Sequence, residues 1–177
     1  MKYGAEGVIN SLFQDTGKSG KARRGLSLTR SEKLSRVALM KIEGKLEKKA
    51  GEKIWGVDIP EIGIFTQGRT KKEAYEMAKE AIELVVDLEG FEVTIEPGQN
   101  NSFFVAPNKI GPILAMVLRQ KRVANGLSIR EVADRLGQSS PNAYGRYETG
   151  TSIPTIEKFD KLLAAIDPGS SSILKVA

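Results

Sequence analysis

The sequence predicts an α+β protein in which a small β-β-β-α-β domain precedes an all-α domain of short helices. Between residues 37 and 108, short runs of alternating apolar and polar residues surround one amphipathic helical stretch, which is typical of strands packed against a helix. From residue 109 to 168, short helical patterns are instead separated by Gly and Pro. Several tight helices in so short a stretch are typical of a DNA-binding module.

Two flanking segments complete the predicted organisation. Residues 1–36 mix Gly, Ser, Lys and Arg with few apolar residues, so we expect a basic, flexible N-terminal extension. A nucleic-acid-binding arm is the alternative interpretation of that segment. Residues 169–177 form a short C-terminal tail after the last helix.

Composition narrows the possible chemistry. The 177 residues include no Cys and no His, which excludes disulfides, thiolate nucleophiles, imidazole bases and zinc sites built on these side chains. No cofactor or metal is expected, and an enzyme is disfavoured. The sequence has no apolar run of 18 or more residues and no apolar core of a secretory signal at its start, so we expect a cytoplasmic protein.

The net charge of +5 is unevenly distributed. Residues 1–39 hold eight basic residues against three acidic ones, and the remainder holds nineteen of each. Overall charge is therefore weak support for nucleic-acid binding, which has to be judged from local patterns.

The α/β domain begins with alternation over residues 40–47, followed by predicted strands at 54–59 and 64–67. Strands at 91–95 and, as an edge strand, at 103–105 follow the helix. Trp55 and Phe65 are expected in the core on burial preference.

The helix between these strands is predicted to begin after Thr70, with Glu73 completing a capping box, and to end at Gly90. Apolar residues at spacings of three and four indicate one buried stripe. Its members are Ala74, Met77, Ala78, Ala81, Ile82, Val85 and Leu88.

In the second domain, Pro112 is expected to open the first helix, and Asn125-Gly126 to close it. Ser128 and Glu131 form a second predicted capping box, on a helix that stops at Gly137. Pro141 begins the next helix, and Pro154 precedes the last one.

The sequence GLSIREVADRLG at residues 126–137, with YGRYETG at 144–150 and PTI at 154–156, resembles the Xre/Cro-type helix-turn-helix. Ala133 is small where two helices approach, and Gly137 permits the turn between them. The resemblance implies a dimeric transcriptional repressor whose residues 110–167 bind operator DNA. The family's frequent Gln at the second position of the second helix is Ile129 here.

The helix that begins at Pro141 would be the recognition helix, which enters the DNA groove. Tyr144 and Tyr147 are expected to anchor it, so that its other residues, Gly145 among them, face outward. Arg146 is suited to guanine, and Asn142 or Gln138 to adenine. Residues 110–150 carry six basic residues against three acidic ones, enough for a few phosphate contacts. The predicted DNA-binding residues are Arg119, Arg130, Gln138, Ser139, Ser140, Asn142, Ala143 and Arg146.

MKIEGKL at residues 40–46, WGVDIPEI at 55–62, FTQGRT at 65–70 and EAYEMAKEAI at 73–82 resemble the HicB antitoxin domain. That resemblance implies a partial RNase H-like fold and an antitoxin that silences a small basic RNA-cleaving HicA toxin and represses its own operon. Family members tend to start near the position of Met40. An alternative interpretation of residues 1–39 is therefore a start codon assigned too far upstream.

Eight acidic residues against Lys79 alone, between residues 73 and 96, would favour capture of a basic toxin. The predicted toxin-binding residues are Glu73, Glu76, Glu80 and Glu83. An ordinary solvated helix face explains the same charges equally well. At the level of the whole protein, the alternative is a stand-alone repressor whose α/β domain binds a ligand or only dimerises.

An RNase H-type nuclease would need several carboxylates converging on Mg²⁺. Glu43 and Glu47 are expected to point away from the core, and Asp58 lies close to a loop. No credible metal cluster emerges, so catalysis is not expected.

Overall fold

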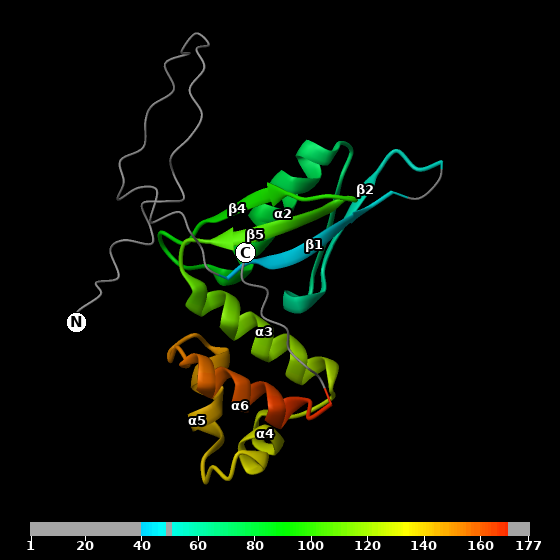
Figure 1. Ribbon diagram of the computed structural model, residues 1–177. Helices are drawn as coiled ribbons and strands as arrows, with labels where there is room; N and C mark the ends of the chain where they lie inside the picture. The colour runs from blue at the N-terminus through cyan, green and yellow to red at the C-terminus, as the bar shows by residue number, and fades with distance from the viewer. Residues whose placement is uncertain (1–39, 49–50, 170–177) are drawn as a thin grey trace, which may run out of the picture. The chain divides into compact units, whose positions relative to one another are not determined.

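The computed structural model describes residues 40–48 and 51–169 (Figure 1). The predictions for residues 1–36 and for nearly all of the tail at 169–177 lie outside these described residues. The described residues form a five-stranded antiparallel sheet and five α-helices, in the order predicted for an α+β protein.

The sheet consists of β1 (Ile42–Glu47), β2 (Trp55–Ile59), β3 (Ile64–Gly68), β4 (Val93–Pro97) and β5 (Ser102–Pro107), with a 3-10 turn, η2 (Pro60–Ile62), between β2 and β3. The strand order is β3-β2-β1-β5-β4. The prediction that residues 103–105 form an edge strand is wrong, because β5 lies between β1 and β4. The edges are β3 and β4.

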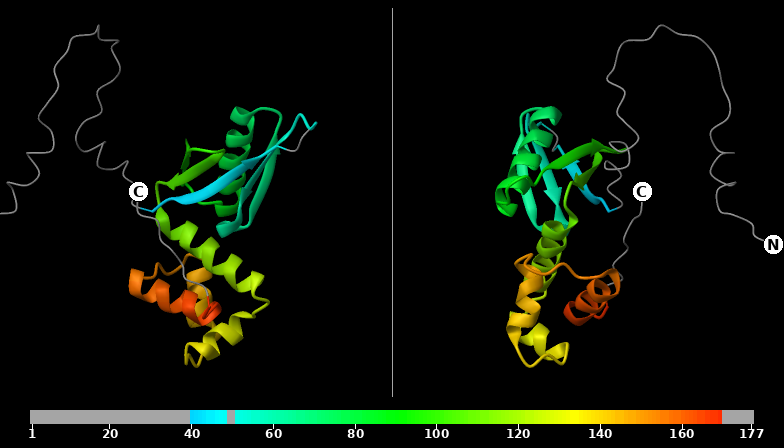
Figure 2. Two further views of the ribbon diagram at one scale, coloured as in Figure 1. Left: turned by 45° about the vertical axis from the view of Figure 1, so that its right-hand side comes forward. Right: turned by 90° about the vertical axis from the view of Figure 1, so that its left-hand side faces the viewer.

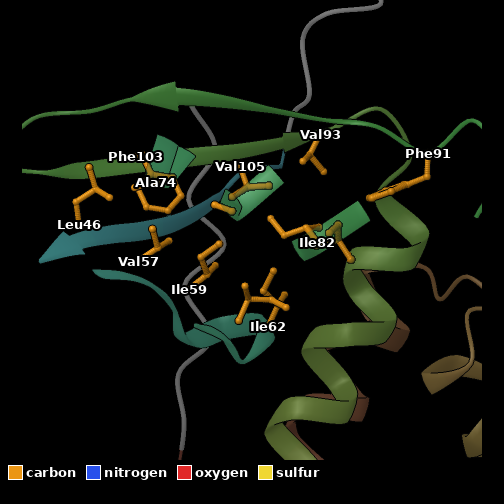
Figure 3. Packing of buried hydrophobic residues seen from close by; sticks show 13 residues of the cluster. Leu46, Val57, Ile59, Ile62, Ala74, Ile82, Phe91, Val93, Phe103 and Val105 are labelled. Atoms are coloured by element: carbon orange, nitrogen blue, oxygen red, sulfur yellow. The ribbon is translucent and has the colours of Figure 1, made fainter. Parts of the chain in front are cut away.

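Helix α2 (Lys71–Val86) covers one face of the sheet, as both views in Figure 2 show. Ala74, Ala78 and Ile82 are fully buried, and their small or branched side chains let the helix lie close to the strands. Figure 3 shows Ala74 and Ile82 facing buried side chains of the strands. The strand residues in this core include Leu46, Val57, Ile59, Val93, Phe103 and Val105.

Helix α2 ends four residues before the predicted stop at Gly90. Asp87 adopts a left-handed conformation, with φ of 44°, and its N–H donates to the carbonyl of Glu83. The predicted buried stripe is therefore only partly correct. Met77, Val85 and Leu88 are 37%, 56% and 47% exposed.

Phe65 is also misassigned, since 74% of its surface is exposed. It alternates along β3 with Ile64 and Gly68, which are buried, so it lies on the sheet face opposite α2. Trp55, by contrast, is half-buried against the core, with Lys48 and Lys71 ammonium groups 5.2 and 4.6 Å from its ring centre.

The helical part contains α3 (Ile110–Ala124), α4 (Ile129–Arg135), α5 (Pro141–Glu148) and α6 (Ile156–Ile166). Helix α3 begins two residues before the predicted Pro112. Proline is tolerated there because N–H groups in the first turn have no partner within the helix.

Helix α3 contributes to two cores. Ile113 packs with the sheet, whereas Leu114 and Leu118 pack with the helices that follow. An ion pair of 3.3 Å between Lys121 Nζ and Glu61 Oε2 also links α3 to the η2 turn. The first helix of the helical part therefore packs directly against the sheet part.

Candidate nucleic-acid interface

Helix α4 begins with the predicted capping box. The Ser128 hydroxyl accepts a hydrogen bond from Glu131 N–H at 3.1 Å, and Glu131 Oε2 accepts one from Ser128 N–H at 2.8 Å. The hydrogen bond from the Ser128 backbone, followed by that from its hydroxyl, lowers the pKa of Glu131. The box fixes the direction in which α4 starts.

The first predicted box, at Thr70, forms only in part. Thr70 Oγ1 accepts from Glu73 N–H at 3.1 Å, but the Glu73 carboxylate accepts from Arg69 N–H instead of the Thr70 backbone.

The turn between α4 and α5 depends on two small residues. Ala133 is completely buried, and its carbonyl accepts a hydrogen bond from Gln138 N–H at 2.9 Å. Gly137 has a φ of 67°, a left-handed conformation that favours glycine. Both features were predicted from the sequence and are confirmed.

Helix α5 begins at Pro141, and Ser140 caps it by accepting a hydrogen bond from Asn142 N–H at 3.3 Å. Tyr144 is fully buried and Tyr147 is half-buried, so both anchor the helix as predicted. This anchoring leaves the opposite face, with Asn142, Ala143 and Arg146, exposed to solvent.

Gly145 does not belong to that outward face. A Cβ placed on it would lie 3.8 Å from Cγ2 of Ile129, so it faces α4 and not the solvent. The expectation that Gly145 faces outward is therefore wrong.

The position of α5 is also fixed by Arg122 on α3. Its Nε and Nη2 atoms donate to the two Glu148 carboxylate oxygens at 2.6 and 2.8 Å, and its Nη1 donates to Leu127 O at 2.7 Å. The hydrogen bond to Glu148 is the main cause that raises the pKa of Arg122. Burial, then the nearby Glu148 carboxylate, raises the pKa of Tyr144, which lies beside this pair.

The prediction from charge overestimated the cations available to phosphates, because several of them already bind protein groups. Arg122 is committed to Glu148, and Lys121 to Glu61. Arg135 donates to Ala165 O at 3.0 Å, at the carbonyl end of α6 where a cation is favourable. No short-range sequence pattern reveals these long-range contacts.

Among the predicted cationic residues, three remain accessible. Arg130 is 3.3 Å from Asp134 in an exposed pair, with both side chains more than half exposed. Arg119 and Arg146 are exposed, and within the described residues neither makes an ion pair. Of the cationic residues predicted to bind DNA, all three are therefore accessible.

The remaining predicted DNA-binding residues lie in the turn before α5. Ser139 and Ser140 are exposed, whereas Gln138 is half-buried with its Oε1 atom enclosed. The structure thus places Ser139, Ser140 and Asn142 at the N-terminal end of α5 and Arg146 in its last turn, and it turns Gln138 partly inward.

The predicted acidic residues of α2 are not equivalent. Glu83 accepts a hydrogen bond from Val93 N–H at 3.0 Å, and Glu73 from Arg69 N–H at 2.8 Å, so both have structural roles. Glu76 and Glu80 are exposed, and only Glu76 has a nearby cation, Lys72, at 3.8 Å.

In the part of the chain that the structure describes, no three acidic side chains come together to hold a metal ion. Over the same residues, no helix is both long and apolar enough to cross a membrane.

A family model described as helix-turn-helix matches residues 118–170, from the second half of α3 through α6. No curated protein matches the chain. The match supports the resemblance to Xre/Cro-type domains over these residues, and the domain indicates a DNA-binding transcription regulator rather than an enzyme.

Proposed function

We propose that this regulator represses transcription by inserting the start of α5 into the major groove of an operator. The observation that carries the proposal is the exposed face of α5, on which Asn142, Ala143 and Arg146 lie opposite the buried Tyr144. Arg146 would pair with guanine and Asn142 with adenine, and Ala143 would contact a thymine methyl group.

Phosphate contacts would come from the residues around this face. Ser139 and Ser140 precede α5, where a helix N-terminus favours an anion. Arg119 and Arg130 lie on α3 and α4, and both are exposed. Arg119 would reach a phosphate directly, and Arg130 would exchange its exposed pair with Asp134 for one. Gln138, whose Oε1 is enclosed, would contribute a hydrogen bond to a base edge only after its side chain turned outward.

We further propose that the sheet part is a partial RNase H-like module acting as a HicB-like antitoxin against a basic, RNA-cleaving HicA-like toxin. Exposed Glu76 and Glu80, on the solvent side of α2, support this idea because they would attract a basic partner. The antitoxin would repress its own operon as a homodimer.

The proposal is tested with full-length protein in two assays. In the first, a gel shift on DNA upstream of its gene should show sequence-selective binding. In the second, the protein should co-purify with the small basic product of an adjacent gene. Binding to DNA without any such partner would favour the stand-alone repressor, and failure of sequence-selective DNA binding would refute the DNA-reading role.

A charge-reversal variant isolates the toxin surface. Changing both Glu76 and Glu80 to Lys should weaken toxin binding and leave the gel shift unchanged. Glu157→Lys, at an exposed position of α6, provides the control and should leave toxin binding intact. Unchanged toxin binding in the double variant would refute the role of these glutamates.

A further inference from the structure

The two edges of the sheet differ in how their backbone groups are satisfied. On the β4 edge, Val93 N–H donates to the Glu83 carboxylate at 3.0 Å. Pro97, at the other end of β4, has no N–H to offer. Side-chain capping and proline both prevent an edge strand from pairing with another chain. The β4 edge is therefore largely closed.

The β3 edge is open. Leu46 N–H donates to Asn101 O on the β5 side, so even-numbered residues of β1 direct their backbone groups toward β5. Carried through the β1–β2 and β2–β3 registers, this alternation makes Ile64, Thr66 and Gly68 bond to β2. Phe65 and Gln67 consequently direct their N–H and C=O groups away from the sheet.

The ends of this edge are closed by local bonds. Gly63 N–H donates to Pro60 O at 3.3 Å, and Arg69 N–H donates to Glu73 at 2.8 Å. Within the described residues, the Phe65 and Gln67 backbone groups have no such partner. The open edge is thus a defined segment at the centre of β3.

Apolar side chains lie on the same side of the molecule as this edge. On α2, Tyr75 contacts Phe103 of β5 and Glu83 bonds to β4, so that side of the helix faces the β4 edge. Met77 and Leu84 lie on the other side of α2, toward β3. Leu84 is 78% exposed, and Phe65 is 74% exposed.

We propose that β3 pairs with β3 of a second copy of this chain, antiparallel, about a two-fold axis at Thr66. The outward N–H of Phe65 would donate to the Gln67 carbonyl of the other copy, and Gln67 N–H to its Phe65 carbonyl. The axis repeats both bonds, so each open group of the edge finds a partner. The inference rests on the dimer in the proposed function.

The side chains of β3 are self-complementary in this register. Thr66 would lie opposite its own copy in a non-hydrogen-bonded pair, and Thr–Thr pairs stabilise sheets. The two Phe65 rings would be diagonal neighbours, about 7–8 Å apart at Cα and within reach of each other. The strand, IFTQG, carries no charge that would oppose its own copy.

The helices would add the area that a short strand cannot supply. A stable interface buries roughly 1,200–2,000 Å² in total, more than a five-residue strand provides. An axis perpendicular to the sheet keeps both α2 helices on one face, so Met77 and Leu84 of each copy would approach each other. A second copy is the proposed occupant because the open segment of β3 is uncharged and complementary to itself in this register.

Cross-linking tests the register directly. The chain has no Cys, so Thr66→Cys introduces a single thiol at the axis. Opposed Cα atoms in a non-hydrogen-bonded pair are about 4.5 Å apart, which a disulfide can span. Mild oxidation of the full chain should give a covalent dimer, whereas Thr94→Cys on the β4 edge should not. Equal cross-linking of both, or of neither, would overturn the proposal.

A second variant measures the association. Phe65→Lys places like charges near the axis, and Thr94→Lys makes the same change at an exposed position of β4. Sedimentation should give a dimer dissociation constant at least about tenfold higher for Phe65→Lys than for Thr94→Lys. Equal dimerisation of the two variants would place the interface elsewhere.

The two proposals fail separately. If Thr66→Cys does not cross-link but the protein still binds its operator, only the β3 interface is refuted. If the covalent dimer forms but no DNA is bound selectively, the interface stands and the DNA-reading role is refuted. A protein that is monomeric alone and pairs β3 only with a toxin strand would also overturn the β3–β3 contact.

Discussion

Arg122 and Glu148, 26 residues apart in the chain, form a two-point ion pair that joins α3 to the last residue of α5. Their side chains are only 14% and 5% exposed. The guanidinium presents a planar fork that matches a carboxylate, so the pair fixes both the distance and the rotation of α5. The exposed face of α5 therefore depends on a contact that binds no DNA itself.

Removing one partner of this pair is expected to destabilise the helical part strongly. Arg122→Met leaves the Glu148 carboxylate buried without its cation, and breaking a buried pair in this way costs about 3–5 kcal/mol. Chemical denaturation followed by circular dichroism measures the loss. Asp134→Asn, which removes the exposed pair with Arg130, is the control and should cost less than about 1 kcal/mol. Comparable losses in the two variants would contradict the importance of the buried pair.

Arg146→Ala is expected to weaken operator binding by about 1–3 kcal/mol and to relax the preference for guanine at one position. Arg119→Ala, at a predicted phosphate contact, should weaken binding to all DNA sequences equally. It should also reduce the slope of log K against log salt concentration by about one. Fluorescence anisotropy on operator and mutated operators, at several salt concentrations, separates the two effects. A uniform loss for Arg146→Ala would mean that it binds phosphate and does not read a base.

The helical part could be predicted closely because its signals are local. Caps at Ser128 and Ser140, left-handed glycines at 126 and 137, and the spacing of Tyr144 and Tyr147 each act within a few residues. The start of the recognition helix and its outward residues follow from them. The contacts of Arg122 with Glu148 and of Arg135 with Ala165 could not be predicted in this way, since each partner lies more than twenty residues away.

The order of strands and helix in the sheet part was predicted correctly, but the exposure of some side chains was not. Periodicity identifies which residues of a strand share a face, yet it cannot say which face a helix covers. Phe65 was placed in the core on the burial preference of its residue type, and its face is the open one. The position of β5 inside the sheet is likewise a matter of pairing between distant strands.

The capping box on α4 predicts a pH effect. The pKa of Glu131 is lowered in the folded protein, so its ionised form contributes stability at pH above the ordinary glutamate value of about 4.3. That contribution is lost as the pH falls through the lowered, folded-state pKa. Thermal unfolding between about pH 6 and 3 should show a smaller acid-induced decrease in Tm for Glu131→Gln than for the unmodified protein. Identical pH profiles would show that this carboxylate contributes nothing.

Two glycines on neighbouring strands should respond in opposite directions to the same substitution. A Cβ on Gly44 would overlap the fully buried ring of Phe103, on the face that packs against α2. Gly44→Ala should therefore force the ring out of place and cost about 1–3 kcal/mol, as overpacking of a core does. The displaced ring would also disturb the packing between β1 and β5, where Gly44 lies opposite Phe103.

Gly56 provides the matched comparison on the open face of β2. A Cβ there would meet Glu47 O at 3.7 Å and the Phe65 ring at 3.8 Å, both ordinary contacts. Gly56→Ala should stabilise the protein by about 0.5–1 kcal/mol, because alanine loses less conformational freedom on folding. Urea unfolding of both variants gives the comparison. A destabilised Gly56→Ala variant would indicate that this face is covered at Gly56, whereas a neutral Gly44→Ala variant would show that the core beneath α2 can rearrange around Phe103.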